Sequence, residues 1–136
     1  MTDIEILLPQ RYPFLFVDEI ISADRNEIIG TKIYDTSFLF FQEYFSNRKI
    51  VPNTILLESI VQCGGAGVNQ IGLFEKSLWG IASIEKVHFL NVVEPNTLVK
   101  MIVRNLKVSN KIIKQTGTAF CEEKAILEAT WMCLRL

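Results

Sequence analysis

Glu58 is the residue of this sequence best suited to acid–base chemistry. It stands in the middle of an apolar run, between Leu57 and Ile60, where a lone carboxylate is costly to bury. Burial favours the neutral carboxylic acid, and a neutral acid in a pocket is a proton donor. A cationic partner, a backbone cap or an opening to solvent would instead give Glu58 a structural role. The spacing alone does not separate the two interpretations.

The other residue types that commonly carry chemistry are few and scattered. The cysteines Cys63, Cys121 and Cys133 lie among apolar neighbours without a CxxC motif, and His88 is the single histidine. We therefore predict no metal site and interpret the cysteines as reduced core residues, with a nucleophilic Cys63 as the alternative. Because the sequence has no glycine-rich phosphate loop, we also expect no nucleotide cofactor.

One long helix is predicted to carry Glu58. The segment from Pro52 to about Phe74 opens on a proline, contains no further proline and is apolar on nearly every side, which is typical of a buried helix. Glycines weaken this helix by about 1 kcal/mol each relative to alanine, and they stand together at Gly64, Gly65 and Gly67. Something must therefore approach the helix backbone closely, either a ligand chain or a bulky side chain from the sheet.

Strands are predicted on both sides of this helix. Apolar and β-branched runs at 14–21 and 28–34, separated by the polar turn 23–26, indicate a hairpin. Later runs at 78–84, 98–108, 112–121 and 125–134 indicate antiparallel strands joined by short turns. In the last run every second residue from Leu127 to Cys133 is apolar, the period of a strand with one buried face. We predict an α+β fold in which an antiparallel sheet wraps one central helix, in a single domain over residues 1–136.

The composition narrows the functional classes. The chain has 136 residues, of which 49% are hydrophobic, enough for one core. Lys+Arg 14 against Asp+Glu 15 argues against a nucleic-acid partner. The mean hydropathy of +0.26 is high for a small monomer, so we expect an oligomer with an apolar interface. No run approaches the roughly 20 apolar residues of a membrane helix, and the first residues do not resemble a signal peptide. We expect no membrane span and a cytoplasmic location.

Four segments resemble a known family: LPQRYPFLFVDEI (8–20), FFQEYFSNRKIVPNTILLESIVQ (40–62), VHFLNVVEP (87–95) and EATWMC (128–133). They look like the matching segments of the β-hydroxyacyl-acyl carrier protein dehydratases of bacterial fatty acid synthesis, and the similarity runs in register over essentially the whole chain. The resemblance implies a hot-dog fold and a hydro-lyase activity. It also implies an acyl chain on acyl carrier protein or CoA as ligand, and a homodimer or higher oligomer whose active sites are shared between two subunits.

The same resemblance implies roles for individual residues. In the family, a histidine before the helix removes the α-proton of the acyl thioester, and a Glu or Asp on the partner's helix handles the β-hydroxyl group. Backbone N–H groups near the helix start polarise the thioester carbonyl. Glu58 matches the acid, and Tyr44 occupies the catalytic histidine position. The positions expected to bind substrate are Phe45, Asn53, Thr54, Gln62, Gly64 and Gly65.

Tyr44 is the main departure from the family pattern, because Gly-His-Phe-Pro-Gly is replaced by Glu-Tyr-Phe-Ser-Asn at 43–47. A phenol, with an ordinary pKa of about 10, is a poor base at pH 7. Tyr44 either donates a hydrogen bond to the thioester carbonyl or fills space. Gln10, Lys49 and Asn53 also replace a family His, Pro and Gly. His88 is either a substitute base or an ordinary strand histidine, and the aromatic run 38–45 belongs either to the core and interface or to the wall of an acyl tunnel.

Three functions fit this pattern. The leading one is a dehydratase-like protein that binds acyl thioesters on a carrier protein as a catalytically degenerate or partner-dependent subunit. It would work in fatty acid or polyene-type biosynthesis, as a homo-oligomer or as a heteromer with an active relative. The alternatives are an active dehydratase that uses Glu58 with an unidentified base, and an acyl thioesterase that uses the same carboxylate.

Overall fold

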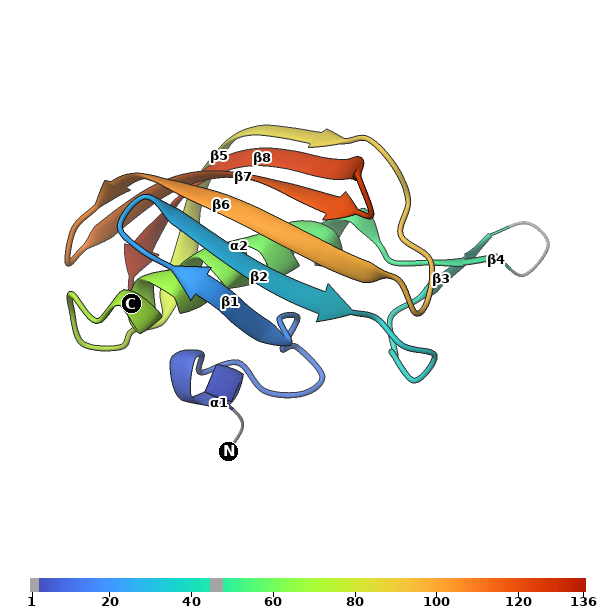
Figure 1. Cartoon of the computed structure of the whole chain (residues 1–136), viewed down its shortest axis with the longest axis horizontal. Coiled ribbons are helices and arrows are strands. Elements are labelled where there is room, and N and C mark those ends of the chain that lie inside the picture. The colour runs from blue at the N-terminus through green and yellow to red at the C-terminus, as the bar shows by residue number, and fades with distance from the viewer. Residues whose placement is uncertain (1–2, 45–47) are drawn as a thin grey trace.

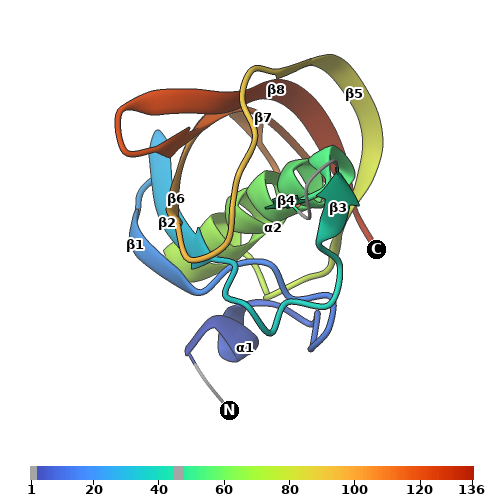
Figure 2. The same ribbon diagram turned by 90° about the vertical axis from the view of Figure 1, so that its right-hand side faces the viewer.

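A six-stranded antiparallel sheet wraps a long helix in the computed structural model, which describes residues 3–44 and 48–136 (Figure 1). The strand order is β1-β2-β6-β7-β8-β5. Its strands are β1 (Glu19–Ala23), β2 (Glu27–Ile33), β5 (Trp79–Phe89), β6 (Leu98–Val108), β7 (Ile112–Cys121) and β8 (Lys124–Arg135). Figure 2 shows the sheet curving over the helix α2 (Asn53–Ile71), which lies on its concave side. This arrangement confirms the predicted α+β fold.

Helix α2 is buried along most of its length, as its apolar sequence predicts, with every residue from Ser59 to Asn69 buried. Its N-cap is Pro52, whose ring fixes φ at −57° before the first turn. Gly72 ends the helix at φ 77°, a left-handed conformation that glycine adopts without steric cost. The predicted helix, from Pro52 to about Phe74, is therefore slightly too long at both ends.

The sheet presents one apolar face to α2. In β7 and β8 every second residue is buried, from Ile113 to Cys121 and from Leu127 to Cys133, which confirms the alternation expected for the last strand. Trp131 and Ile113 are fully buried in the same core cluster as Ile60 of α2. Burying each such side chain contributes about 1.5–3 kcal/mol. Packing against the sheet therefore stabilises the central helix more than local propensity does.

The predicted hairpin is confirmed for β1 and β2 but not for the residues before them. In the turn, the Asp24 carboxylate accepts backbone N–H groups from Asn26 at 2.7 Å and Glu27 at 2.8 Å. These two bonds lower the pKa of Asp24. Residues 14–17 were expected to belong to the first strand, and this is wrong. Their backbone is bonded to side chains of α2, described below, instead of to a neighbouring strand.

Three short elements have no counterpart in the sequence predictions: α1 (Asp3–Leu7), β3 (Gln42–Tyr44) and β4 (Arg48–Ile50). Strands β3 and β4 form an antiparallel ribbon that extends away from the main sheet (Figure 1). Arg48 Nε donates to Glu94 Oε1 at 3.1 Å and so ties β4 to the loop after β5. Strand β5 also continues to Phe89, beyond its predicted end at Ile84. Within the described residues, no helix has the length and apolar character needed to cross a membrane.

Candidate functional site

Glu58 and Gln62 form the polar centre of the candidate site. They lie four residues apart on α2, the spacing that places two side chains on one helix face. Gln62 Nε2 donates a hydrogen bond to Glu58 Oε1 at 3.1 Å. Gln62 is buried, whereas Glu58 is only half-buried. The sequence left open whether Glu58 is enclosed by apolar groups or has a partner and an opening, and in the structure Gln62 is its partner and its face of α2 opens onto a cavity.

Gln62 holds the segment before β1 against the helix. Its Oε1 accepts the N–H of Phe16 at 2.8 Å, and its Nε2 donates to the carbonyl oxygen of Phe14 at 2.9 Å. These two backbone partners fix which end of the amide carries nitrogen. Both N–H bonds of Nε2 are then used, one by Phe14 and one by Glu58. Gln62 thus orients the Glu58 carboxylate, and its own binding of substrate stays a prediction.

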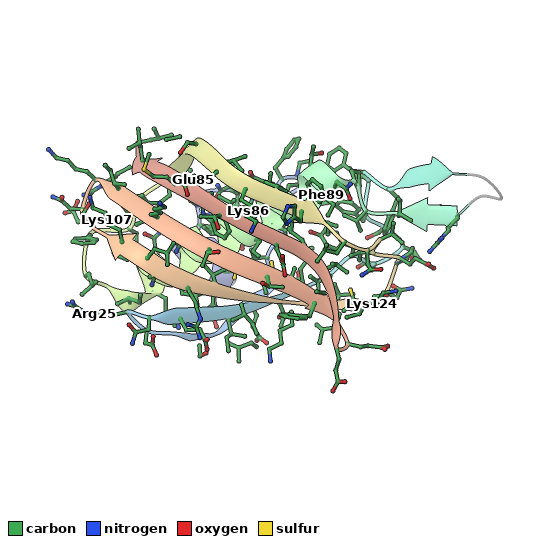
Figure 3. The ribbon with its side chains drawn as sticks, turned by 90° about the horizontal axis from the view of Figure 1, so that it is seen from above. Arg25, Glu85, Lys86, Phe89, Lys107 and Lys124 are labelled. Carbon is green, nitrogen blue, oxygen red and sulfur yellow. The ribbon has the colours of Figure 1, made fainter. Side chains whose placement is uncertain are left out.

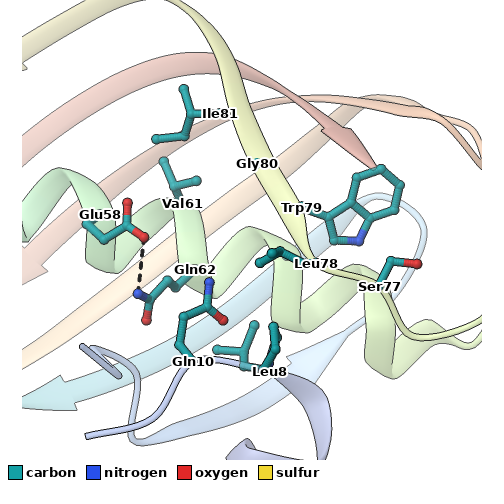
Figure 4. A pocket seen from close by; sticks show the side chains of 12 residues that line it. Leu8, Gln10, Glu58, Val61, Gln62, Ser77, Leu78, Trp79, Gly80 and Ile81 are labelled. Carbon is teal, nitrogen blue, oxygen red and sulfur yellow. Dashed lines mark hydrogen bonds between the residues drawn. The ribbon is translucent and has the colours of Figure 1, made fainter. Parts of the chain in front are cut away.

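A cavity of about 240 Å³ lies beside this pair (Figure 4). One wall is the face of α2 that carries Glu58, Val61, Gln62 and Gly65. The other walls are the N-terminal segment 8–10 and the start of β5 with the loop before it, residues 77–81. Most of these groups are apolar, with a few polar groups among them, which is typical of a small-ligand site.

Asn69 fixes the end of the cavity that lies away from Glu58. Its Nδ2 donates to the carbonyl oxygens of Leu7 at 2.8 Å and Ser77 at 2.9 Å, and its Oδ1 accepts the N–H of Ser77 at 3.1 Å. The indole Nε1 of Trp79 also donates to this Oδ1, at 3.3 Å. Asn69 therefore ties α2 to the N-terminal segment and to residues 77–79, the segments that carry the other two walls. A buried amide on an apolar helix is a visible sequence signal, but no motif in the sequence pointed to Asn69 or Trp79.

The three glycines of α2 have different neighbours. Gly65 lines the cavity, and a Cβ placed on it would lie 3.6 Å from Trp79 Cδ1, an ordinary contact. A Cβ on Gly64 would instead clash with the side chain of Gln115 from β7, and one on Gly67 with Ile28 from β2. Side chains of the sheet thus make the close approach at these two positions. The structure does not bring Gly64 to the cavity, although it was expected to bind substrate.

The start of α2 holds two more of the expected substrate-binding residues, Asn53 and Thr54, both exposed. Among the described residues no side chain caps this end of the helix. The first N–H groups of a helix lack intrahelical partners and carry its positive dipole end, so they suit a carbonyl oxygen that gains negative charge. Thr54 lies one turn before Glu58, about 6 Å along the axis. A thioester between them would therefore have the N–H donors of the helix start on one side and the Glu58 carboxyl group on the other.

The loop before α2 contains the two remaining expected positions. Tyr44 is the last residue of β3, where its backbone is paired with that of Arg48. Phe45 lies outside the residues that the structure describes. The roles predicted for both residues therefore stay predictions.

Cys133 of β8 is close enough to Glu58 to be affected by its charge. Burial, with the Glu58 carboxylate as a second cause, raises the pKa of the Cys133 thiol to about 12. Burial alone raises the pKa of Cys63 to about 12 as well. Both thiols therefore remain protonated near neutral pH, and a protonated, buried thiol is a poor nucleophile. This supports the interpretation of Cys63 as a core residue.

His88 and the aromatic run lie away from the cavity wall. His88 is exposed on β5, opposite Glu128 of β8, with 3.9 Å between its Nδ1 and Glu128 Oε2. This placement fits an ordinary strand histidine. Phe38 packs against the rings of Phe16 and Phe41, with centroids 6.1 and 5.1 Å apart, and belongs to the margin of the core. Phe38, Phe40 and Phe41 therefore pack at the margin of the core and do not line the cavity.

No group of three or more His, Cys, Asp or Glu side chains within residues 3–44 and 48–136 is arranged to hold a metal ion. The chemistry that these residues offer is that of a carboxylate, an amide network and a helix N-terminus beside an apolar cavity. An antiparallel sheet that wraps a buried helix is the hot-dog fold. Solved structures with this fold include dehydratases and thioesterases.

Comparisons with known proteins identify the family. A family model described as the FabA-like domain matches residues 8–130. The chain is 36% identical to a 3-hydroxyacyl-[acyl-carrier-protein] dehydratase FabZ of Koribacter versatilis, over 98% of this chain and 86% of the relative. It is 32% identical to the FabZ dehydratase of Syntrophobacter fumaroxidans, over 90% and 84%. The chain therefore belongs to the FabA-like family, beside the FabZ dehydratases, as its sequence motifs predicted.

Solved structures support the fold. The dehydratase heterocomplex ApeI:P from Xenorhabdus doucetiae matches with a TM-score of 0.85 at 12% identity, covering 100% of this chain and 92% of that one. A hypothetical thioesterase with coenzyme A from Streptococcus pneumoniae matches with a TM-score of 0.66 at 13% identity, covering 87% and 84%. At such low identity these matches show the shared hot-dog fold alone.

Proposed function

We propose that this chain binds acyl thioesters carried on acyl carrier protein and acts as a partner-dependent, catalytically degenerate subunit of a 3-hydroxyacyl dehydratase. The observation that carries the proposal is an intact acid position beside a changed base position. Glu58 lies on the cavity and is oriented by Gln62, while Tyr44 occupies the position that matches the family's histidine.

The dehydration reaction needs two groups, and the chain supplies one of them. A base must take the α-proton as the carbon–carbon double bond forms, and an acid must give a proton to the β-hydroxyl group as the carbon–oxygen bond breaks and water leaves. Glu58, in its protonated form, can supply the second proton, and Gln62 fixes its direction. Tyr44 cannot serve as an efficient base near neutral pH, because an ordinary phenol loses its proton at about pH 10.

A partner can supply the missing base if the active site is shared between two chains, as in the family that this sequence resembles. The helix of this chain would then present Glu58 to the histidine loop of an active relative. The ApeI:P neighbour is itself described as a dehydratase heterocomplex, which supports this arrangement. A homodimer of this chain would combine Glu58 with Tyr44 in both sites and would lack an efficient base.

Strand β5 offers a surface for such an interface. It lies at one end of the strand order, so one of its edges is available for pairing. Its exposed apolar side chains include Ile81, Ile84 and Phe89, each more than 40% exposed. Figure 3 shows Glu85, Lys86 and Phe89 along this strand at the margin of the sheet. Ile81 also lines the cavity, so a partner bound to β5 would lie next to the site.

Mixing experiments test the proposal. The purified chain is incubated with β-hydroxyacyl-carrier substrate alone, and then after co-expression with a FabZ-type relative whose own acid has been changed to glutamine. We expect no turnover from either chain alone and restored turnover from the mixed complex. Glu58→Gln in this chain should abolish that restoration. Strong turnover by this chain alone would contradict the proposal and favour an active dehydratase, and release of free thiol that depends on Glu58 would favour a thioesterase.

The setting of this activity follows from the same proposal. A 3-hydroxyacyl substrate on a carrier protein places the chain in fatty acid or polyene-type biosynthesis. A location in the cytoplasm, a single domain over the whole chain and the absence of a nucleic-acid partner stay predictions.

A further inference from the structure

The amide oxygen of Gln10, in the wall of the cavity, has no hydrogen-bond partner. The residue lines the cavity together with Glu58 and Gln62, and its Oε1 atom is buried without a hydrogen-bond partner. Figure 4 shows the amide of Gln10 next to that of Gln62, at the edge of the open space. A buried polar atom without a partner is uncommon in native proteins, and it calls for a physical reason.

The position of Gln10 relative to Glu58 follows from the bonds that hold its segment. Leu7 is bonded to Asn69, and Phe14 is bonded to Gln62. Gln10 lies on the chain between these two anchors. Since Asn69 and Glu58 lie on opposite sides of Gln62 along α2, the segment that carries Gln10 covers the part of the cavity on the Asn69 side. From Gln62 to Asn69 this part extends about 10 Å along the helix axis.

The neighbours of Gln10 in this part of the cavity are mainly apolar. Leu8, Leu78 and Trp79 line the same cavity, and Trp79 is held in place by its bond to Asn69. An unsubstituted acyl chain lying there would offer the Gln10 amide no hydrogen-bond partner, and a buried polar group without a partner is costly. A hydroxyl group can accept a hydrogen bond from the amide nitrogen or donate one to the amide oxygen, so it satisfies Gln10 in either orientation.

We propose that Gln10 is a specificity-determining residue that recognises a hydroxyl group on the acyl chain, at a carbon farther from the thioester than the β-carbon that meets Glu58. The substrate class is then an acyl thioester with a second polar group on its chain. This inference rests on the proposed function, because it takes the cavity to be the acyl-binding site and Glu58 to mark the β-carbon.

Binding measurements with defined analogues test Gln10 directly. The probes are six-carbon acyl chains joined through an amide to aminopantetheine, which carries an amine in place of the pantetheine thiol; the amide link prevents hydrolysis and lactone formation. One chain is unsubstituted, and the others carry a single hydroxyl group at carbon 3, 5 or 6. Titration calorimetry with the full chain compares the wild type with Gln10→Met, which keeps the length of the side chain and removes its polar atoms. Leu78→Met is the matched control, because it changes the lining of the same cavity without changing its polarity.

We expect the wild type to bind the 5- or 6-hydroxy analogue about 5- to 10-fold more tightly than the unsubstituted one, the ratio that one buried neutral hydrogen bond provides. Gln10→Met should lose this preference and bind the unsubstituted chain at least as well as the wild type does. Leu78→Met should keep the preference. An equal change for all four analogues in Gln10→Met would show a role in shape alone and would overturn the inference.

Other outcomes separate the inference from the proposed function. A preference for the 3-hydroxy analogue that depends on Glu58, without any gain for the 5- or 6-hydroxy analogue, would overturn the role of Gln10 and leave the proposed function standing. A preference that depends on Gln10 but concerns only the 3-hydroxyl group would also overturn it. If no analogue binds at all, the proposed function fails, and the inference fails with it.

Discussion

Gln62→Met would remove the amide that joins Glu58, Phe14 and Phe16, with little change in side-chain length. The N–H of Phe16 would lose its 2.8 Å bond to Gln62 in a buried position, and a buried donor left without a partner costs about 1–3 kcal/mol. The carbonyl of Phe14 is only partly buried and can recover a bond to water, so its loss adds about 1 kcal/mol at most. We expect the free energy of unfolding to fall by about 1–4 kcal/mol.

Urea denaturation at a fixed protein concentration measures this loss, since an oligomer's stability depends on concentration. Gln70→Met is the control, because Gln70 is exposed on the same helix and its replacement should change the free energy of unfolding by no more than about 0.5 kcal/mol. If Gln62→Met were as mild as Gln70→Met, Gln62 would not anchor the segment before β1, and the positioning of Glu58 by this network would be refuted.

Three further predictions follow from the packing and the charges. Gly67→Ala should lower the free energy of unfolding by about 1–3 kcal/mol, because its Cβ would clash with Ile28, whereas Gly65→Ala should be neutral or stabilising, and thermal unfolding of both variants checks this contrast. Burial raises the pKa of the Cys63 thiol to about 12, so iodoacetamide at pH 8 should not label it in the native protein but should label it in urea. Peptide mass spectrometry measures the labelling, and a labelled Cys63 in the native protein would contradict its burial. Because two backbone N–H groups lower the pKa of Asp24, its contribution to stability should be present above pH 4 and be lost as the pH falls through the lowered pKa. Asp24→Asn should therefore weaken the dependence of the free energy of unfolding on pH below pH 4. An unchanged pH dependence in this variant would show that the turn bonds do not stabilise the fold.

The central helix and its polar pair could be predicted from the sequence because both are local features. An apolar run without an internal proline indicates a buried helix, and a spacing of four residues places Glu58 and Gln62 on one face. The alternation from Leu127 to Cys133 identifies a half-buried strand for the same reason. The glycines of the helix indicated close approach correctly, although Gln115 makes that approach at Gly64.

The walls of the cavity could not be predicted, because contacts between distant segments form them. Residues 14–17 have the composition of a strand, yet side chains of α2, more than 40 positions away, bond their backbone and replace a strand partner. Gln10 was visible only as a departure from the family pattern, and no local signal connects it to Trp79 or Gly65 across the cavity. The degree of exposure of Glu58 also depends on these distant segments.

The most direct test is the dehydration of a β-hydroxyacyl-carrier substrate by the purified chain, with the wild type measured beside Tyr44→His. Formation of the enoyl product is followed, and the double variant Tyr44→His with Glu58→Gln controls for the acid. If the cavity and Glu58 are intact and only the base is missing, the wild type is inactive, Tyr44→His gains turnover, and the double variant loses it. General bases contribute about 10²- to 10⁴-fold, so the gain should be easily measured. Turnover by the wild type at the level of Tyr44→His would contradict the degenerate site.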